Sequence, residues 1–145
     1  MIALIQRVSE ASVTVAEAVT GRIGPGLLVF LAVQPDDTLE TVRRMAERVL
    51  TYRVFPDSEK RMNRSLMDEG LGLLLVPQFT LAADTRKGMR PSFSGAADPE
   101  TGSALFTEVV DIMAAVSERV QSGRFGADMS VSLVNDGPVT FWLQS

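Results

Sequence analysis

Apolar and polar positions along the first 33 residues follow the pattern of β-strands. Residues 2–8 and 11–16 alternate and are rich in β-branched side chains, and residues 27–33 form a continuous apolar run. An uninterrupted run of this length is typical of a strand buried on both faces. We therefore predict three strands, and the turns between them use Gly21, Gly24, Pro25 and Gly26.

Two amphipathic helices are predicted. The first covers roughly residues 38–50, with Asp37 as its N-cap, an acidic residue three positions later and apolar residues at helical spacing. The second begins after Asp98, has Pro99 at its first position and continues to a stop at Gly123. Each helix has one apolar face to bury against a sheet.

Three more strands are expected in the second half of the chain. The apolar run 71–76 ends at Pro77, which lacks the N–H that a sheet ladder needs, so we interpret it as a central strand leading into a functional loop. Residues 129–134 and 139–143 are separated by the turn-forming residues Asn135, Asp136, Gly137 and Pro138. We predict one α+β domain, in which mostly antiparallel or mixed sheets form a barrel-like or sandwich core with two main helices.

The composition excludes several kinds of active site. The 145 residues include no Cys and no His, which rules out a disulfide, a thiolate nucleophile, a Ser-His-Asp triad and a Cys/His zinc site. Proton transfer must then use carboxylates, Lys, water, backbone groups or the substrate. The spacing of Asp36, Asp37, Asp57 and Asp136 fits no known metal-binding loop, and we expect no metal and no cofactor.

The charge pattern limits the partners. The formal net charge of -4 argues against non-specific DNA binding, while the basic segments 43–64 and 84–94 fit either a local anion site or a solvated helix face. No stretch approaches the roughly 18 consecutive apolar residues of a membrane helix, and the N-terminus lacks the features of a signal peptide. We expect a soluble, cytoplasmic protein.

Two segments place polar and conformationally special residues at strand ends. In the first, the N–H groups of Gln78, Phe79 and Thr80 form an oxyanion pocket if the loop turns them inward; the alternative is a strand end with a polar edge. In the second, Gly137 permits close backbone approach and Pro138 makes a rigid wall; the alternative is a hairpin turn.

Longer motifs around these segments resemble the D-aminoacyl-tRNA deacylases, formerly called D-tyrosyl-tRNA deacylases. They are QFTLAADTRKGMRPSFSGAADP at residues 78–99 and DMSVSLVNDGPVTFWLQ at residues 128–144, and the opening MIALIQRVSEASVTV is similar to the same family. The resemblance implies a cytoplasmic homodimer that proofreads translation. Such an enzyme hydrolyses the ester of D-aminoacyl-tRNA, and of mischarged glycyl-tRNA, at the 3′-terminal adenosine and rejects L-aminoacyl-tRNA.

The resemblance also assigns roles to single residues. The pair Gly137-Pro138 would be the Gly-cisPro motif that reaches into the partner's active site, excludes L-amino acids and holds the α-amino group. The N–H groups of Phe79 and Thr80 would face the scissile carbonyl, with Gln78 orienting the loop and Phe79 packing by the adenine. The supporting residues would be Arg7, Pro77, Asn135 and Asp136, and the tRNA phosphate contacts Arg86, Lys87 and Arg90.

Two mechanistic alternatives stay open. An aminoacyl ester is already activated, so water near backbone donors suffices with help from the adjacent ribose hydroxyl, whereas Thr80 as a covalent nucleophile needs an activating group that the sequence does not show. The family usually has Ser where this chain has Pro77, which removes a hydroxyl and an N–H. The alternative function is therefore a catalytically silent RNA- or metabolite-binding dimer of the same fold.

Overall fold

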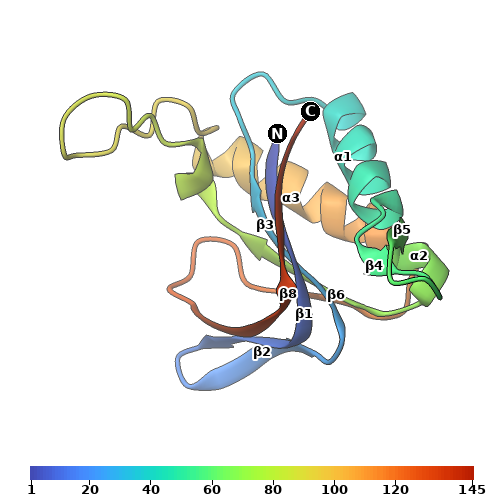
Figure 1. The fold of residues 1–145 in the computed structure, drawn as a ribbon. Helices are drawn as coiled ribbons and strands as arrows, with labels where there is room; N and C mark the ends of the chain where they lie inside the picture. The colour runs from blue at the N-terminus through green and yellow to red at the C-terminus, as the bar shows by residue number, and fades with distance from the viewer.

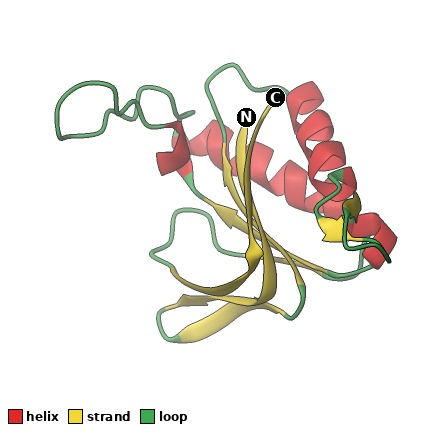
Figure 2. Ribbon diagram, in the orientation of Figure 1, coloured by secondary structure: helices red, strands yellow, loops and turns green.

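In a computed structural model that describes residues 1–145, one curved β-sheet carries the longer helices on one face (Figures 1 and 2). The chain termini lie side by side, because the first and last strands pair antiparallel, starting from Ile2 opposite Gln144. The strands are β1 (Ile2–Val15), β2 (Ala18–Ile23), β3 (Gly26–Ala32), β4 (Phe55–Pro56), β5 (Met62–Arg64), β6 (Gly72–Pro77), β7 (Val120–Ser122) and β8 (Ser130–Gln144). The helices are α1 (Leu39–Thr51), α2 (Leu66–Glu69) and α3 (Pro99–Ala114), with a 3-10 helix η1 (Phe79–Ala82).

The main sheet is mixed and nearly closed. Its order is β2-β1-β3-β6-β7, and β8 pairs with β1. The pairs of β1 with β2, β3 and β8 are antiparallel, whereas β3, β6 and β7 run parallel. The sheet curls until β2 meets β6 and β7, since a Cβ added to Gly21 would lie 2.9 Å from Leu74 Cδ1 and 3.2 Å from the Ser122 carbonyl oxygen. The predicted α+β class with a barrel-like core is confirmed.

Alternate residues of the central strands supply two apolar clusters, one on each face of the sheet. On the helix-bearing face, Leu27, Val29 and Leu31 of β3 pack with the buried faces of α1 and α3. On the other face, Leu28 packs with Leu74 and the second half of β1. The run 27–33 is therefore buried on both sides, as predicted, and the central strands form a rigid support. No helix combines the length and apolar character needed to pass through a bilayer.

The N-terminal half differs from the sequence prediction at three points. Residues 2–8 and 11–15 belong to one long strand, β1, while Ala16 lies in the turn that follows. The segment expected to be turns contains the strand β2, with Gly21 inside it. The N-cap of α1 is Thr38 rather than Asp37. The Asp37 carboxylate instead accepts from the Gln34 N–H and from the amino group of Met1.

The C-terminal half differs at two points. Asp98 caps α3 as predicted, but the helix ends at Ala114 and Gly123 follows the short strand β7 instead of stopping a helix. The segment 135–138 is not a hairpin turn. It is a bulge within the single strand β8, opposite Arg7 of β1, where the register shifts between two stretches of regular pairing.

Candidate active site

Two free backbone donors stand at the C-terminal end of β6. The N–H of Gln78 is taken, because it donates to the Leu31 carbonyl at 2.8 Å. In the 3-10 helix that follows, the first intrahelical bond runs from the N–H of Leu81 to the Gln78 carbonyl at 3.2 Å. The N–H groups of Phe79 and Thr80 precede that bond and have no intrahelical acceptor. Of the three N–H groups predicted for an oxyanion pocket, two remain free.

The side chains of this loop also interact. The amide nitrogen Nε2 of Gln78 donates to Thr80 Oγ1 at 2.5 Å. A donor placed on a hydroxyl oxygen occupies a lone pair and cannot remove its proton, so this contact orients Thr80 without activating it as a nucleophile. No other side chain is hydrogen bonded to Thr80, so no carboxylate accepts the proton of its hydroxyl group.

An apolar pocket of about 530 Å³ opens beside the loop, a size suited to a small ligand. Its wall includes Phe79 and Phe93, whose rings meet edge to face with centroids 5.1 Å apart. The other lining residues are Val76, Pro77, Gln78, Ala96, Ala97, Pro99, Phe125, Gly126, Ala127, Asp128, Met129 and Val131. A hollow of about 620 Å³ among β1, β2 and β8 is larger, but neither an aromatic side chain nor a residue of the β6 loop lines it, so the pocket at the β6 loop is the better candidate.

Arg7 anchors the 135–138 bulge. Its Nη1 donates to the Val54 carbonyl at 2.7 Å, while its Nε donates to the Asp136 carbonyl at 3.2 Å and pairs with the Asp136 carboxylate at 3.2 Å. The Arg7 side chain is only 13% exposed, whereas that of Asp136 is 59% exposed. The clamp therefore holds the backbone of the bulge from within the protein.

The bulge itself presents a small, exposed ridge. Gly137 has φ +130° and the Gly137-Pro138 peptide bond is cis. Asn135 binds the residues that follow the bulge, because its Oδ1 accepts from the Val139 N–H at 3.1 Å and its Nδ2 donates to Thr140 Oγ1 at 2.9 Å. Gly137 and Pro138 are exposed to solvent between these two anchored points.

The bulge and the β6 loop do not meet within one chain. Strands β8, β1, β3 and β6 lie side by side in that order. Pro77 is level with Leu31 of β3 and so with Ala3 of β1, whereas the bulge faces Arg7, four residues further along β1. At about 4.8 Å between strands and about 3.3 Å per residue, the two segments are on the order of 20 Å apart. The structure thus brings Gln78, Phe79 and Thr80 together and places Gly137 and Pro138 elsewhere.

The basic residues after the loop lie on a finger, defined here as residues 84–92. Two backbone hydrogen bonds between Asp84 and Ser92, of 2.8 and 3.1 Å, close its base. Arg86 donates from Nε and Nη2 to the Asp84 carboxylate at 2.9 and 2.7 Å, and these bonds hold the pKa of Asp84 well below its usual value. Lys87 and Arg90 form no ion pair, and they line a small polar hollow together with Asp84, Arg86 and Ser92.

Three of the seven cations of the 43–64 segment have partners within the protein. Arg48 donates to the Gln144 carbonyl at 2.7 Å, Arg61 pairs with Glu59 at 3.1 Å, and Arg64 pairs with Glu69. The side chains of the other four cations, Arg43, Arg44, Arg53 and Lys60, form no ion pair and no hydrogen bond, so the solvated-face interpretation stays a prediction. The remaining candidate carboxylate there, Asp57, accepts from the Asn63 side chain and the Arg61 N–H, which lower its pKa.

Three of the largest side chains in the pocket wall were not predicted as site residues: Phe93, Phe125 and Met129. They come from the loop before α3 and from the segment before β8, and no local pattern relates them. Phe93 lies inside the longer motif, but only the folded chain shows that its ring packs on Phe79. Phe93 is 43% exposed and lies outside any helix or strand, so no helical or strand spacing of apolar residues marks it as a site residue.

Comparisons with known proteins agree along the whole chain. The family model described as D-Tyr-tRNA(Tyr) deacylase matches residues 4–144. The chain is 60% identical over 145 residues to a D-aminoacyl-tRNA deacylase of Alkalilimnicola ehrlichii, covering 100% of this chain and 97% of that one. It is 62% identical over 144 residues to a D-aminoacyl-tRNA deacylase of Methylococcus capsulatus, covering 99% and 94%.

Solved structures give the same result for the fold. One titled c-Myc DNA Unwinding Element Binding Protein superimposes with a TM-score of 0.95 at 36% identity, covering 100% of this chain and 99% of the other. Another, titled a probable eukaryotic D-amino acid tRNA deacylase, superimposes with a TM-score of 0.86 at 21% identity, covering 98% and 97%, and shows the fold alone.

Proposed function

The chain belongs to the D-Tyr-tRNA(Tyr) deacylase family, and we propose that it hydrolyses the ester between a D-amino acid and the 3′-terminal adenosine of tRNA. Water adds to the ester carbonyl carbon, the bond to the ribose oxygen breaks, and that oxygen takes up the proton. The products are the free D-amino acid and reusable tRNA. The observation that carries the assignment is the pair of free N–H groups at Phe79 and Thr80 beside an aromatic pocket.

The site suits a reaction without a side-chain base. As the carbonyl carbon becomes tetrahedral, its oxygen gains negative charge, and the N–H groups of Phe79 and Thr80 are fixed donors for it. The pocket formed by Phe79 and Phe93 accepts the terminal adenine, which positions the ester over these donors. The neighbouring ribose hydroxyl, a group that DNA lacks, assists the attacking water.

Gln78 and Thr80 orient this loop rather than attack the substrate. Thr80 Oγ1 receives the hydrogen bond of Gln78, and no base contacts it. A direct, non-covalent hydrolysis therefore has more support than an acyl-enzyme on Thr80. Pro77 leaves both free N–H groups in place, since it is the last residue of β6 and precedes them in the chain.

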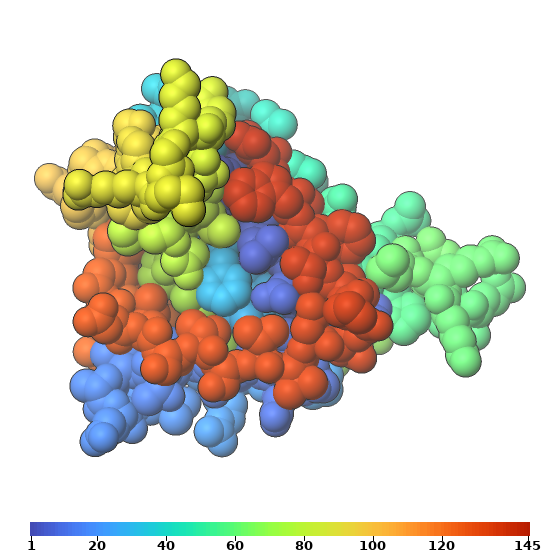
Figure 3. Space-filling model, turned by 60° about the vertical axis from the view of Figure 1, so that its left-hand side comes forward, coloured from blue at the N-terminus to red at the C-terminus, as the bar shows by residue number.

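Chiral selection in this proposal needs a second copy of the chain. The exposed ridge Gly137-Pro138 lies about 20 Å from the loop of its own protomer, so only a partner's ridge can stand at the site. The helix-free face offers a contact surface, because Leu4, Phe30 and Trp142 lie side by side on it and Trp142 is 51% exposed. Figure 3 shows β8 in red framing blue β1 and cyan β3 there.

The partner's ridge would act as a wall beside the α-carbon. An L side chain would collide with it, a D side chain points away, and glycine has none, so D-aminoacyl and glycyl esters are cleaved while L-esters are spared. Carbonyl oxygens of the ridge accept from the α-amino group. Arg7, Asn135 and Asp136 keep the ridge in place.

The finger supplies cations for the tRNA. Lys87 and Arg90 are the unpaired cations of the finger, with Arg86 beside them, and Phe93, the residue after the finger, lines the pocket. These cations are therefore the candidates for phosphates near the 3′ end. Charge reversal at Arg86 and Lys87 together should weaken tRNA binding and flatten its dependence on salt. We place the enzyme in the cytoplasm, where aminoacyl-tRNA is its substrate.

The test is release of labelled amino acid from matched D-tyrosyl-, L-tyrosyl- and glycyl-tRNA, with a Pro138→Ala variant in parallel. We expect rapid cleavage of the D- and glycyl esters and a spared L-ester, with the L-ester becoming a substrate for Pro138→Ala. Sedimentation velocity should show a dimer that Trp142→Glu dissociates and inactivates. No cleavage of any ester by a folded dimer would transfer the assignment to a silent RNA- or metabolite-binding dimer.

A further inference from the structure

The finger is a built structure rather than a loose loop. The backbone bonds between Asp84 and Ser92 close its base, and the Asp84 carboxylate also accepts from the backbone N–H of Arg86 at 3.0 Å. The closed finger stands out from the body of the protein (Figures 1 and 3). A segment held in this way can present its tip in one orientation.

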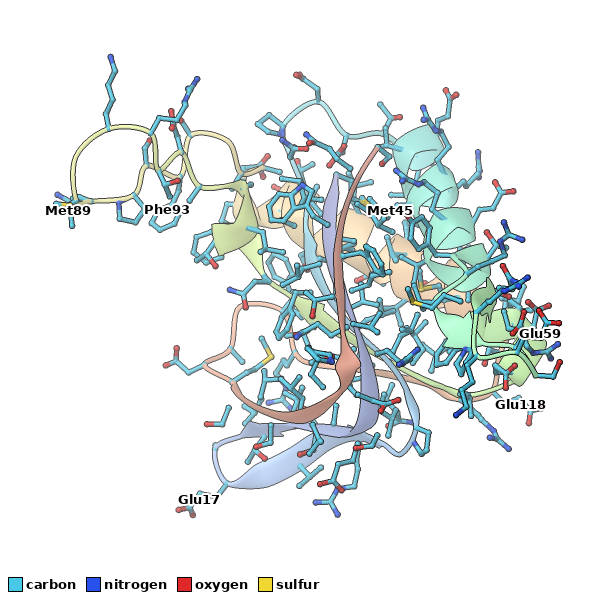
Figure 4. All side chains as sticks on the ribbon, in the orientation of Figure 1. Glu17, Met45, Glu59, Met89, Phe93 and Glu118 are labelled. Carbon is cyan, nitrogen blue, oxygen red and sulfur yellow. The ribbon has the colours of Figure 1, made fainter.

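An apolar side chain occupies the tip of the finger. Met89 is fully exposed, at 102% of the reference area, and no other large apolar side chain of the protein is as exposed. Figure 4 places it at the outermost point of the loop, with Phe93 nearer the body. Gly88, with φ +71°, makes the bend before it. Single exposed apolar residues are common on proteins, but this one has a distinctive setting.

That setting is cationic. Lys87 and Arg90 flank Met89 closely in sequence and carry no ion pair, whereas Arg86 is held by Asp84 on two nitrogens. An apolar tip between two free cations matches nucleic acid, in which apolar base faces alternate with phosphates. Phe93 lines the pocket and follows the finger directly in the chain, so the finger adjoins the place proposed for the terminal adenosine.

We propose that Met89 packs against an unpaired base just before the terminal adenosine, while Lys87 and Arg90 hold the adjoining phosphates and Arg86 shapes the finger. This inference rests on the proposed function and extends it from the terminal nucleotide to the single-stranded RNA that leads to it. The contact is to a base face, so it favours unpaired RNA without selecting a base. Arg86 thereby becomes a positioning residue rather than a main phosphate contact.

Two substrates of different length test the proposal. We would compare D-tyrosyl-tRNA with D-tyrosyl-adenosine, which lacks every nucleotide that the finger would touch. Met89→Ala should lower kcat/KM for the tRNA by roughly fivefold or more, from the usual effect of losing one base contact, and leave D-tyrosyl-adenosine unchanged. Met89→Leu should restore most of the loss. Met67→Ala, at the exposed Met67 of α2, is the matched control and should change neither substrate.

Salt dependence separates the roles of the finger residues. Lys87→Ala and Arg90→Ala should each reduce the slope of log affinity against log salt by about one, whereas Met89→Ala should leave the slope unchanged. Equal losses on both substrates, or no loss with tRNA, would overturn the proposal. A shift from dimer to monomer in Met89→Ala would also overturn it and assign the tip to a second copy of the chain. If the parent cleaves neither substrate, the proposed function itself fails.

Discussion

Arg7 offers a direct test of how the 135–138 bulge is held. Replacing Arg7 by Ala removes a hydrogen bond to the Val54 carbonyl and two contacts to Asp136, one to its carbonyl and one to its carboxylate. The bond to Val54 is short, partly buried and made by a charged donor, and such bonds contribute about 1.5–3 kcal/mol. The ion pair with the exposed Asp136 carboxylate adds at most about 1 kcal/mol.

We therefore expect Arg7→Ala to lower the free energy of unfolding by about 2–4 kcal/mol. For a chain of this length, that corresponds to a Tm roughly 6–13 °C lower. Asp136→Asn is the matched control, since it removes only the exposed charge and leaves the bonds to both carbonyls, so its cost should stay below about 1 kcal/mol. Urea unfolding followed by circular dichroism measures both values.

The same variants report on selectivity. With the ridge loosened, the ratio of D- to L-tyrosyl-tRNA cleavage should fall in Arg7→Ala and remain close to that of the parent in Asp136→Asn, measured below the melting range of both. Equal destabilisation by the two variants would show that the carboxylate, not the backbone clamp, carries the interaction. Parental stability in Arg7→Ala would refute the clamp altogether.

Three further outcomes are expected. Gly26→Ala should destabilise the protein by about 3 kcal/mol or more in urea unfolding, because its Cβ would lie 1.9 Å from the Gly72 carbonyl oxygen, whereas Gly24→Ala, with open space around it, should be neutral. Pro77→Ser should change the rate of D-tyrosyl-tRNA hydrolysis by less than about threefold, since Pro77 blocks neither free N–H; a large gain would show that proline had impaired the site. The urea midpoint should be constant from about pH 5.5 to 7 and fall below about pH 4. Hydrogen bonds lower the pKa of four carboxyl groups, and the stabilisation is lost as these groups take up protons; they are Asp57, Asp68, Asp84 and Asp98. A step near pH 6.5 would contradict this, since the chain has no His.

Local chemistry made some elements easy to predict. The run 27–33 is apolar throughout and is buried on both faces as expected, and Asp98 with Pro99 starts α3 as expected. Each of these features acts within a few residues. The β2 strand was missed because Gly21 suggests a turn, while in the fold it provides space for Leu74 of a distant strand.

The candidate site shows the same division. Gln78, Phe79 and Thr80 are adjacent in the chain, so their shared loop follows from sequence, and the absence of Cys and His by itself limits the chemistry open to that loop. The N–H of Gln78 donates to the Leu31 carbonyl, while the N–H groups of Phe79 and Thr80 remain free. This difference depends on the pairing of β3 with β6. No pattern near Gln78 contains that information.

Strand and helix tendencies, the Asp98 cap of α3 and the types of chemistry available are properties of neighbouring residues, and the chain alone determined them. Tertiary structure decided that residues 135–138 form a bulge in one long strand, that Arg7 holds it through a backbone carbonyl of Val54 and one of Asp136, and that it lies far from the β6 loop of its own chain. Long-range pairing sets these relations, because the energy of a contact depends on which surfaces the whole fold brings together, not on the separation of residues along the chain.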